Sequence, residues 1–188
     1  KRLSEAQNKI LPPLPGCLSG VAGAFSHRAC LEVFDQPDIQ FYPQFEDVFR
    51  AVSLGERRYG IIPIENTLAG SVTDNYDLMP QYRLYIVGTV KVKIEHSLLV
   101  LPGTKLSDIK QVYSHEQLCI SVPIFKSYPP LHRILFNTAA SAKFVAEQND
   151  PSIAAIGSLE CARMYGLEVL AQSIQNRRDN FTRFVVLA

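Results

Sequence analysis

Short apolar segments alternate with amphipathic segments along most of this chain. Apolar runs bounded by turn-forming residues are typical of buried strands, and apolar residues three and four positions apart are typical of helices that cover a sheet. Because alternating strands and helices favour crossover connections, the pattern predicts an α/β fold with a largely parallel sheet. The predicted strands are residues 17–21, 39–42, 59–64, 111–114, 134–136, 153–156 and 184–187.

Three segments between these strands carry helical patterns with recognisable ends. Gly55 and Gly166 follow two of them and can adopt the left-handed conformation that ends a helix. Thr138 begins the third, where its hydroxyl can accept a hydrogen bond from a free backbone amide. The predicted helices are residues 45–54, 138–148 and 158–165.

One stretch breaks the alternation and indicates a passage between two lobes. Residues 84–100 contain no helical interval, and Val90, Val92 and Ile94 alternate with charged residues, as in a long strand or a bent ribbon. The polar residues 172–180 suit a return, and the proline-rich start suits a linker from an upstream domain. We therefore expect a linker at 1–16, a first lobe from 17–92 plus 177–188, and a second lobe from 93–176.

Composition narrows the class of protein. With 47% hydrophobic and 20% charged residues, the 188-residue chain is expected to fold rather than to be disordered. A formal charge of +1 without a basic block argues against nucleic acid as a partner, and no apolar stretch approaches the roughly 20 residues of a membrane span. The four cysteines and four histidines lack metal-ligand spacing, so we expect no metal, buried thiols and a cytoplasmic location.

Four clusters of glycines and polar residues follow predicted strands, where open α/β sheets bind ligands. The first cluster is residues 20–27, which lack both dinucleotide and P-loop motifs. Its glycines, including Gly23, allow a tight turn whose amides could hold a carboxylate at a helix start. The alternative is an ordinary turn in which Ser26 caps the helix.

The second cluster supplies an acid, an amide and two hydroxyls in seven residues: Glu65, Asn66, Thr67 and Ser71. It suits ligand binding, but a turn at Asn66 and a cap at Ser71 would be ordinary.

The third and fourth clusters offer further candidates. Thr182 and Arg183 start the last strand, where Arg183 could instead be a surface cation stacked on rings and Thr182 a good strand former. Ser114 and Gln117 flank a predicted strand end, where Ser114 could simply cap a helix.

Together these motifs resemble the prephenate dehydratase family, and the likeness covers residues 17–188 in the family's order. The threonine-arginine-phenylalanine run at residues 182–184 is the most telling of them. The matching segments are residues 20–27, Ile64-Glu65-Asn66-Thr67 with Gly70, Tyr113-Ser114-His115 with Gln117, Tyr165-Gly166-Leu167 and Asn180-Phe181-Thr182-Arg183-Phe184.

The resemblance implies conversion of prephenate to phenylpyruvate in phenylalanine biosynthesis by a carbon–oxygen lyase without a cofactor. It implies a two-lobed fold like that of type 2 periplasmic binding proteins, with the substrate in a cleft between lobes. Thr182 matches the family's catalytic threonine, and Arg183 would hold a carboxylate or orient the Thr182 loop. The other residues expected at the substrate are Glu65, Asn66, Thr67, Ser71, Ser26, Gly23, Ser114, Gln117, Thr138 and Phe184.

Two alternatives stay open: arogenate dehydratase, whose substrate carries an amino group in place of the keto oxygen, and a non-catalytic module that binds a small carboxylate. The resemblance also implies a homodimer and covalently linked chorismate mutase and ACT regulatory domains in the full-length chain. Because the ACT module would sense phenylalanine, we expect no feedback inhibition of this chain alone.

Overall fold

The computed structural model describes residues 15–114, 131–134, 137–175 and 179–188. Two compact units divide the chain. The first holds the residues up to Val21, Phe25–Ile94 and Asn180–Ala188, and the second holds Ala22–Ala24 and Glu95–Asp179. The divisions after Ile94 and Asp179 lie near the expected ones after residues 92 and 176, but residues 22–24 group with the second unit rather than the first.

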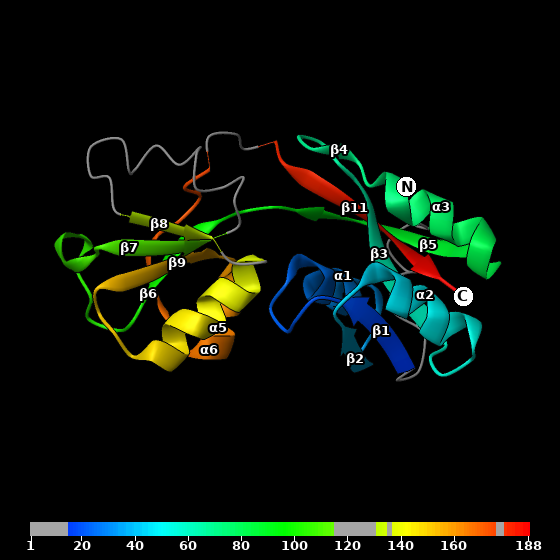
Figure 1. Ribbon diagram of the computed structural model, residues 1–188, viewed down its shortest axis with the longest axis horizontal. Coiled ribbons are helices and arrows are strands. Elements are labelled where there is room, and N and C mark those ends of the chain that lie inside the picture. The colour runs from blue at the N-terminus through cyan, green and yellow to red at the C-terminus, as the bar shows by residue number, and fades with distance from the viewer. Residues whose placement is uncertain (1–14, 115–130, 135–136, 176–178) are drawn as a thin grey trace, which may run out of the picture. The chain divides into compact units, whose positions relative to one another are not determined.

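The sheet of the first unit has the strand order β2-β1-β3-β11-β5, with β4 paired to β3 off this path. β1 pairs in parallel with β2 and β3, whereas β11 runs antiparallel to both β3 and β5 (Figure 1). The expectation of a largely parallel sheet is therefore wrong, because the last strand enters the middle of the sheet in the opposite direction. The strands are β1 (Pro15–Ser19), β2 (Asp38–Tyr42), β3 (Tyr59–Asn66), β4 (Gly70–Ser71), β5 (Ile86–Lys93) and β11 (Phe181–Leu187).

Helices cover both faces of this sheet, and β11 contributes side chains to the core on each face. Val185 and Leu187 pack in the core that includes residues of α2 (Phe45–Ser53) and α3 (Thr73–Tyr82). Phe184 and Val186 face the opposite side, where α1 (Phe25–Val33) supplies Ala29 and Cys30. Successive side chains of a strand point to opposite faces, so β11 belongs to both cores.

The second unit contains a mixed sheet of five strands in the order β10-β6-β9-β7-β8, with helices α5 and α6. α5 packs on β9 and β7, and its small residues Ala139 and Ala142 are fully buried. Short side chains let a helix backbone approach a sheet closely. The elements are β6 (Ser97–Val100), β7 (Gln111–Ser114), β8 (Leu131–Ile134), α5 (Thr138–Gln148), β9 (Ile153–Gly157), α6 (Leu159–Tyr165) and β10 (Glu168–Ala171), with a 3₁₀ turn at Leu106–Asp108.

Several helix starts differ from the expected ones. Asn137, not Thr138, caps α5, because its side-chain oxygen accepts a hydrogen bond from the amide of Ala140 at 2.7 Å. Ser71 lies in β4 and does not cap α3, and Ser26 lies inside α1 rather than before it. Local chemistry permits several capping residues within a few positions, and tertiary packing selects one.

The long apolar alternation at residues 84–100 is not one strand. β5 ends at Lys93 and β6 begins at Ser97, and Ile94 is the last residue of the first unit.

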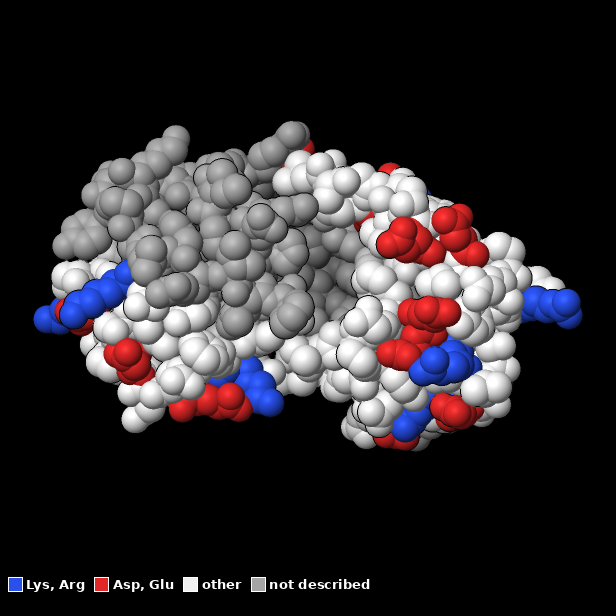
Figure 2. Space-filling model, in the orientation of Figure 1, with Lys and Arg blue, Asp and Glu red and all other residues white. Residues whose placement is uncertain are grey.

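On the face drawn in Figure 2, acidic and basic side chains of the described residues are interspersed. Among the described residues, no helix is both long enough and apolar enough to cross a membrane.

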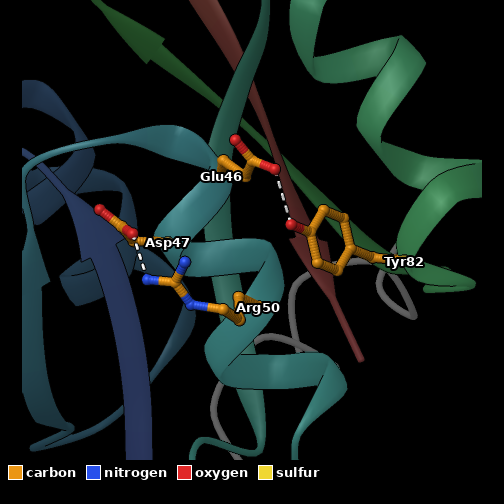
Figure 3. A network of polar contacts seen from close by, with 4 residues as sticks. All are labelled: Glu46, Asp47, Arg50 and Tyr82. Atoms are coloured by element: carbon orange, nitrogen blue, oxygen red, sulfur yellow. Dashed lines mark hydrogen bonds and ion pairs between the residues drawn. The ribbon is translucent and has the colours of Figure 1, made fainter.

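A polar contact joins α2 to α3 on the first unit. The Tyr82 hydroxyl donates a hydrogen bond to Glu46 Oε1 at 2.7 Å, while Arg50 pairs with Asp47 one turn along α2 (Figure 3). The bond to the Glu46 carboxylate, chiefly, raises the pKa of Tyr82, because it favours the protonated phenol.

We expect Tyr82 to ionise above the usual tyrosine pKa of about 10. Its contact then stabilises the fold below that pH and is lost as the pH rises through the raised pKa. Ultraviolet titration of the unsubstituted protein minus Tyr82→Phe isolates this group among the eight tyrosines. Glu46→Ala should return the pKa toward its ordinary value and Asp47→Ala should change it little; an equal effect of both would contradict the contact.

Candidate active site

A β-bulge decides which residue of β3 faces Thr182. Phe184 pairs with Pro63, but Arg183 pairs with Glu65 and Thr182 with Asn66, so Ile64 is an extra residue on β3. Without that residue the regular register would place Glu65 opposite Thr182. The bulge therefore exchanges a carboxylate for a carboxamide at the position facing the predicted catalytic hydroxyl.

The Asn66 side chain joins the end of β3 to the start of β11. Its Oδ1 accepts hydrogen bonds from the amides of Leu68 and Ala69, both at 2.9 Å. Because amides can only donate, these two bonds fix the orientation of the carboxamide and turn its NH₂ group toward β11. Nδ2 of Asn66 lies 2.7 Å from Asn180 Oδ1, 3.1 Å from Phe181 O and 2.9 Å from Thr182 Oγ1.

Thr182 is 9% exposed and accepts the Asn66 hydrogen bond through its hydroxyl oxygen. A hydroxyl oxygen that accepts from one group still carries a hydrogen that it can donate to another. Thr67 strengthens the same junction, since its Oγ1 accepts from the Phe181 amide at 2.9 Å and its own amide donates to the Phe181 carbonyl at 2.9 Å. Thr182 thus lies beside Asn66, 116 residues away in the sequence, and Thr67 binds the neighbouring Phe181. The contact of these residues with a substrate stays a prediction.

Arg183 and Glu65 lie on the other face of the sheet. Neighbouring residues of a strand point to opposite faces, so Arg183 points away from the side on which Thr182 and Asn66 meet. Arg183 Nε lies 3.8 Å from Glu65 Oε2, and the two side chains are 54% and 48% exposed. A pair this exposed contributes little to stability. Lys91 is opposite Arg183 on β5 and lies 4.4 Å from the Phe181 ring centroid.

The remaining candidates of the first unit have different surroundings. Ser26 is 7% exposed near the start of α1, and α1 covers the sheet face on which Thr182 lies. Ser71 pairs with Glu65, so it belongs to the opposite face. Phe184 is 3% exposed and packs within the α1 core; its expected contact with the substrate stays a prediction.

Gly23 is bound into the second unit. Its carbonyl accepts hydrogen bonds from Ser158 Oγ at 3.1 Å and Cys161 Sγ at 3.2 Å, and Tyr165 Oη donates to the Ala22 carbonyl at 2.9 Å. These bonds are the reason that residues 22–24 group with α6 rather than with the first unit. Burial raises the pKa of the Cys161 thiol, as it raises that of Cys30 to about 12, so neither thiol suits nucleophilic chemistry.

Three candidates of the second lobe are placed only in part. Ser114 ends β7 and is fully buried, and its Oγ has no hydrogen-bond partner among the described residues. Thr138 begins α5. Gln117 lies outside the described residues, and the expected cleft between lobes stays a prediction.

The structure also brings in residues that sequence reasoning did not select. Asn180 belongs to the quoted terminal motif but had no assigned role, and its side chain accepts from Asn66. Ser158, identified only as a helix end, and Tyr165, quoted in a family motif without an assigned role, hold residues 22–24. In the described part of the chain, no group of three or more His, Cys, Asp or Glu is arranged to hold a metal ion.

Comparison with known families identifies the family of the chain. The profile described as prephenate dehydratase matches residues 17–188. The chain belongs to the prephenate dehydratase family. The resemblance drawn from the motifs is confirmed.

Individual members of the family are similar over most of the chain. Arogenate dehydratase 2 of Petunia hybrida is 41% identical over 170 residues, which are 90% of this chain and 43% of that protein. The bifunctional chorismate mutase/prephenate dehydratase of Escherichia coli (strain K12) is 39% identical over 193 residues, covering 99% of this chain and 50% of that protein. The chain therefore spans about half the length of the curated relatives it matches.

A solved structure extends the likeness to the fold. The prephenate dehydratase of Arthrobacter aurescens, solved in complex with L-Phe, has a TM-score of 0.83 and 28% identity over 92% of this chain and 59% of that chain. The predicted two-lobed α/β fold class is confirmed.

We expect Gly23→Ala to destabilise the second unit through two separable effects. Gly23 has φ +87°, and an added Cβ would lie 2.9 Å from Cys161 Sγ. The left-handed conformation costs roughly 1–2 kcal/mol, and the overpacked contact about 1–3 kcal/mol more. Urea unfolding measures the total.

Gly103→Ala is the matched control, because Gly103 has φ +81° and nothing within 4 Å of an added Cβ. Its free energy of unfolding should fall only by the cost of the left-handed backbone conformation. Equal losses for the two variants would show that the Cys161 contact is unimportant, whereas adding Cys161→Ala to Gly23→Ala should recover part of the difference.

Proposed function

We propose that this chain is the catalytic module of a prephenate dehydratase, a carbon–oxygen lyase that converts prephenate to phenylpyruvate, carbon dioxide and water. The single observation that carries the proposal is the hydrogen bond from Asn66 Nδ2 to Thr182 Oγ1. Membership of the family and the convergence of its motif residues on one strand pair support it. A fold alone would not, because one fold serves many functions.

The reaction needs three things from the protein. The carboxylates must be held, the leaving hydroxyl must be stabilised, and the bond to the ring carboxylate must break as the ring becomes aromatic. The electrons of that carbon–carbon bond enter the ring, carbon dioxide leaves, and the departing hydroxide takes a proton to become water. Aromatisation supplies the driving force, so the residues need only hold the carboxylates, favour departure of the oxygen and favour loss of the ring carboxylate.

Thr182 is the donor to the departing oxygen. Asn66 occupies one lone pair of the Thr182 hydroxyl and thereby directs its hydrogen away from β3. Because the Asn66 carboxamide is itself held by the amides of Leu68 and Ala69, the donor is oriented before the substrate binds. A threonine hydroxyl is a weak acid, so it acts by hydrogen bonding or by relaying a proton.

Arg183 has a supporting role in this proposal. Two functions were open for it: holding a substrate carboxylate or orienting the Thr182 loop. Its position on the opposite face of β11 and its pairing with Glu65 favour the second. Ser26, on the Thr182 side, and Thr67 are the better candidates in this unit for contact with the substrate; the roles expected of Gly23, Ser114, Gln117 and Thr138 stay predictions.

Arogenate is the second candidate substrate, because arogenate dehydratase 2 of Petunia hybrida is as similar to this chain as the bifunctional enzyme is. The two substrates differ at the side chain and share the ring that reacts. Turnover measured side by side on both decides between them.

We further propose a cytoplasmic homodimer that needs no cofactor, linked in the full-length protein to chorismate mutase and ACT domains; sedimentation equilibrium tests the dimer.

We expect Thr182→Ala to lower kcat for prephenate by about 100-fold or more, because it removes the donor to the leaving oxygen. KM should change little, since that hydrogen bond strengthens as the oxygen departs. Thr182→Ser should retain most of the turnover. Phenylpyruvate absorbance in alkali measures the rate.

Thr89→Ala is the matched control, because Thr89 is an exposed threonine of the same sheet. It should turn over prephenate like the unsubstituted chain. Undiminished turnover by Thr182→Ala would remove Thr182 from the mechanism, and no turnover of either substrate by the unsubstituted chain would overturn the proposed function.

A further inference from the structure

The β3 bulge has a support that the motif residues do not supply. Past Ile61, β3 no longer pairs with β1, so the backbone around Pro63 loses its neighbour on that side. Pro63 has no N–H of its own, and its carbonyl still needs a donor, because buried backbone groups without partners are costly. A side chain of α3 meets this need.

Asn75 supplies the donor. It is fully buried in the first turn of α3, and its Nδ2 donates a hydrogen bond to the Pro63 carbonyl at 2.7 Å. The adjacent carbonyl, that of the extra residue Ile64, accepts from the Val72 amide at 2.9 Å. The two backbone carbonyls that precede Glu65 are therefore both held from the segment that leads into α3.

The Asn75 side chain is an unusual choice if its role is only to fill space. Its Oδ1 has no hydrogen-bond partner among the described residues, and an apolar side chain would avoid burying that oxygen unpaired. An apolar side chain, however, could not donate a hydrogen bond to the Pro63 carbonyl. The hydrogen bond that Asn75 Nδ2 donates to the Pro63 carbonyl therefore explains why an asparagine is buried here.

The position of Pro63 matters because Pro63 is the last residue of β3 that pairs with β11 before the bulge. Pro63 pairs with Phe184, and the bulge that follows sets Asn66 opposite Thr182. A loss of the bulge would shift the pairing by one residue and present Glu65 to Thr182 instead. A carboxylate only accepts hydrogen bonds, so it would turn the Thr182 hydrogen toward itself and away from a leaving group.

We propose that Asn75 is a positioning residue, which fixes the β3 bulge through the Pro63 carbonyl and so keeps the Asn66 carboxamide on the Thr182 hydroxyl. This inference rests on the proposed function for its catalytic consequence. Its structural part, that Asn75 sets the surroundings of the Asn66 carboxamide, does not depend on the substrate.

The test uses Asn75→Leu in the whole 188-residue chain, with rates expressed per folded molecule. Leu keeps the branching and the number of side-chain heavy atoms, and it removes the donor together with the unpaired oxygen. We expect kcat for prephenate to fall roughly 10- to 100-fold, as for a small misplacement of a catalytic group, with KM nearly unchanged. The Asn66 side-chain NH₂ signals in a ¹⁵N–¹H spectrum should move at the same time.

Phe34→Leu is the control for general destabilisation. Phe34 is buried in the α1 core and contacts Tyr59 at the opposite end of β3 from the bulge. It should lower stability while leaving kcat per folded molecule and the Asn66 signals in place. Asn75→Ala serves as the second variant if Asn75→Leu does not fold.

The outcomes separate the two proposals. An Asn75 variant that folds with normal kcat and unmoved Asn66 signals overturns the positioning role, as does an equal fall of kcat in Phe34→Leu. If the unsubstituted chain turns over neither prephenate nor arogenate, the proposed function fails, and the Asn66 signals of the Asn75 variants still decide whether Asn75 holds the bulge.

Discussion

The register between β3 and β11 is the constraint on which the candidate site depends. One extra residue on β3 sets Asn66, rather than Glu65, opposite Thr182. A carboxamide can accept from the turn that follows β3 and donate to the hydroxyl across the strand pair, which a carboxylate cannot do. The Thr182 hydroxyl accepts from Asn66, and in the proposed function it donates its own hydrogen to the departing oxygen.

The strand that carries Thr182, β11, is the last strand of the chain and lies in the interior of the first sheet. The strand lies between β3 and β5, and its side chains fill the cores on both faces. Four buried residues, Phe184 to Leu187, anchor it, while Thr182 and Arg183 lie at the end where the packing gives way to polar contacts. A rigid apolar strand therefore carries the polar residues, which keeps their geometry fixed without ligand.

The glycine turn after β1 has a packing role that the sequence did not predict. Anion binding by its amides was one interpretation, but its Gly23 carbonyl is used by Ser158 and Cys161. The close approach of Cys161 leaves no room for a side chain at residue 23. The glycine is explained by backbone packing in the second unit, which does not prevent the neighbouring amides from meeting a ligand.

The sequence by itself determined most elements and the motif residues. Residues 111–114 and 138–148 form the predicted strand and helix, because burial periodicity and helix ends are local properties. The order of motifs identified the family, which the profile confirms. Antiparallel entry of β11, the bulge at Ile64 and the Asn75 contact were not predictable, since each depends on partners far apart in the chain. Local pattern determines which residues are buried, whereas register and hydrogen-bond partners are decided only when distant strands meet.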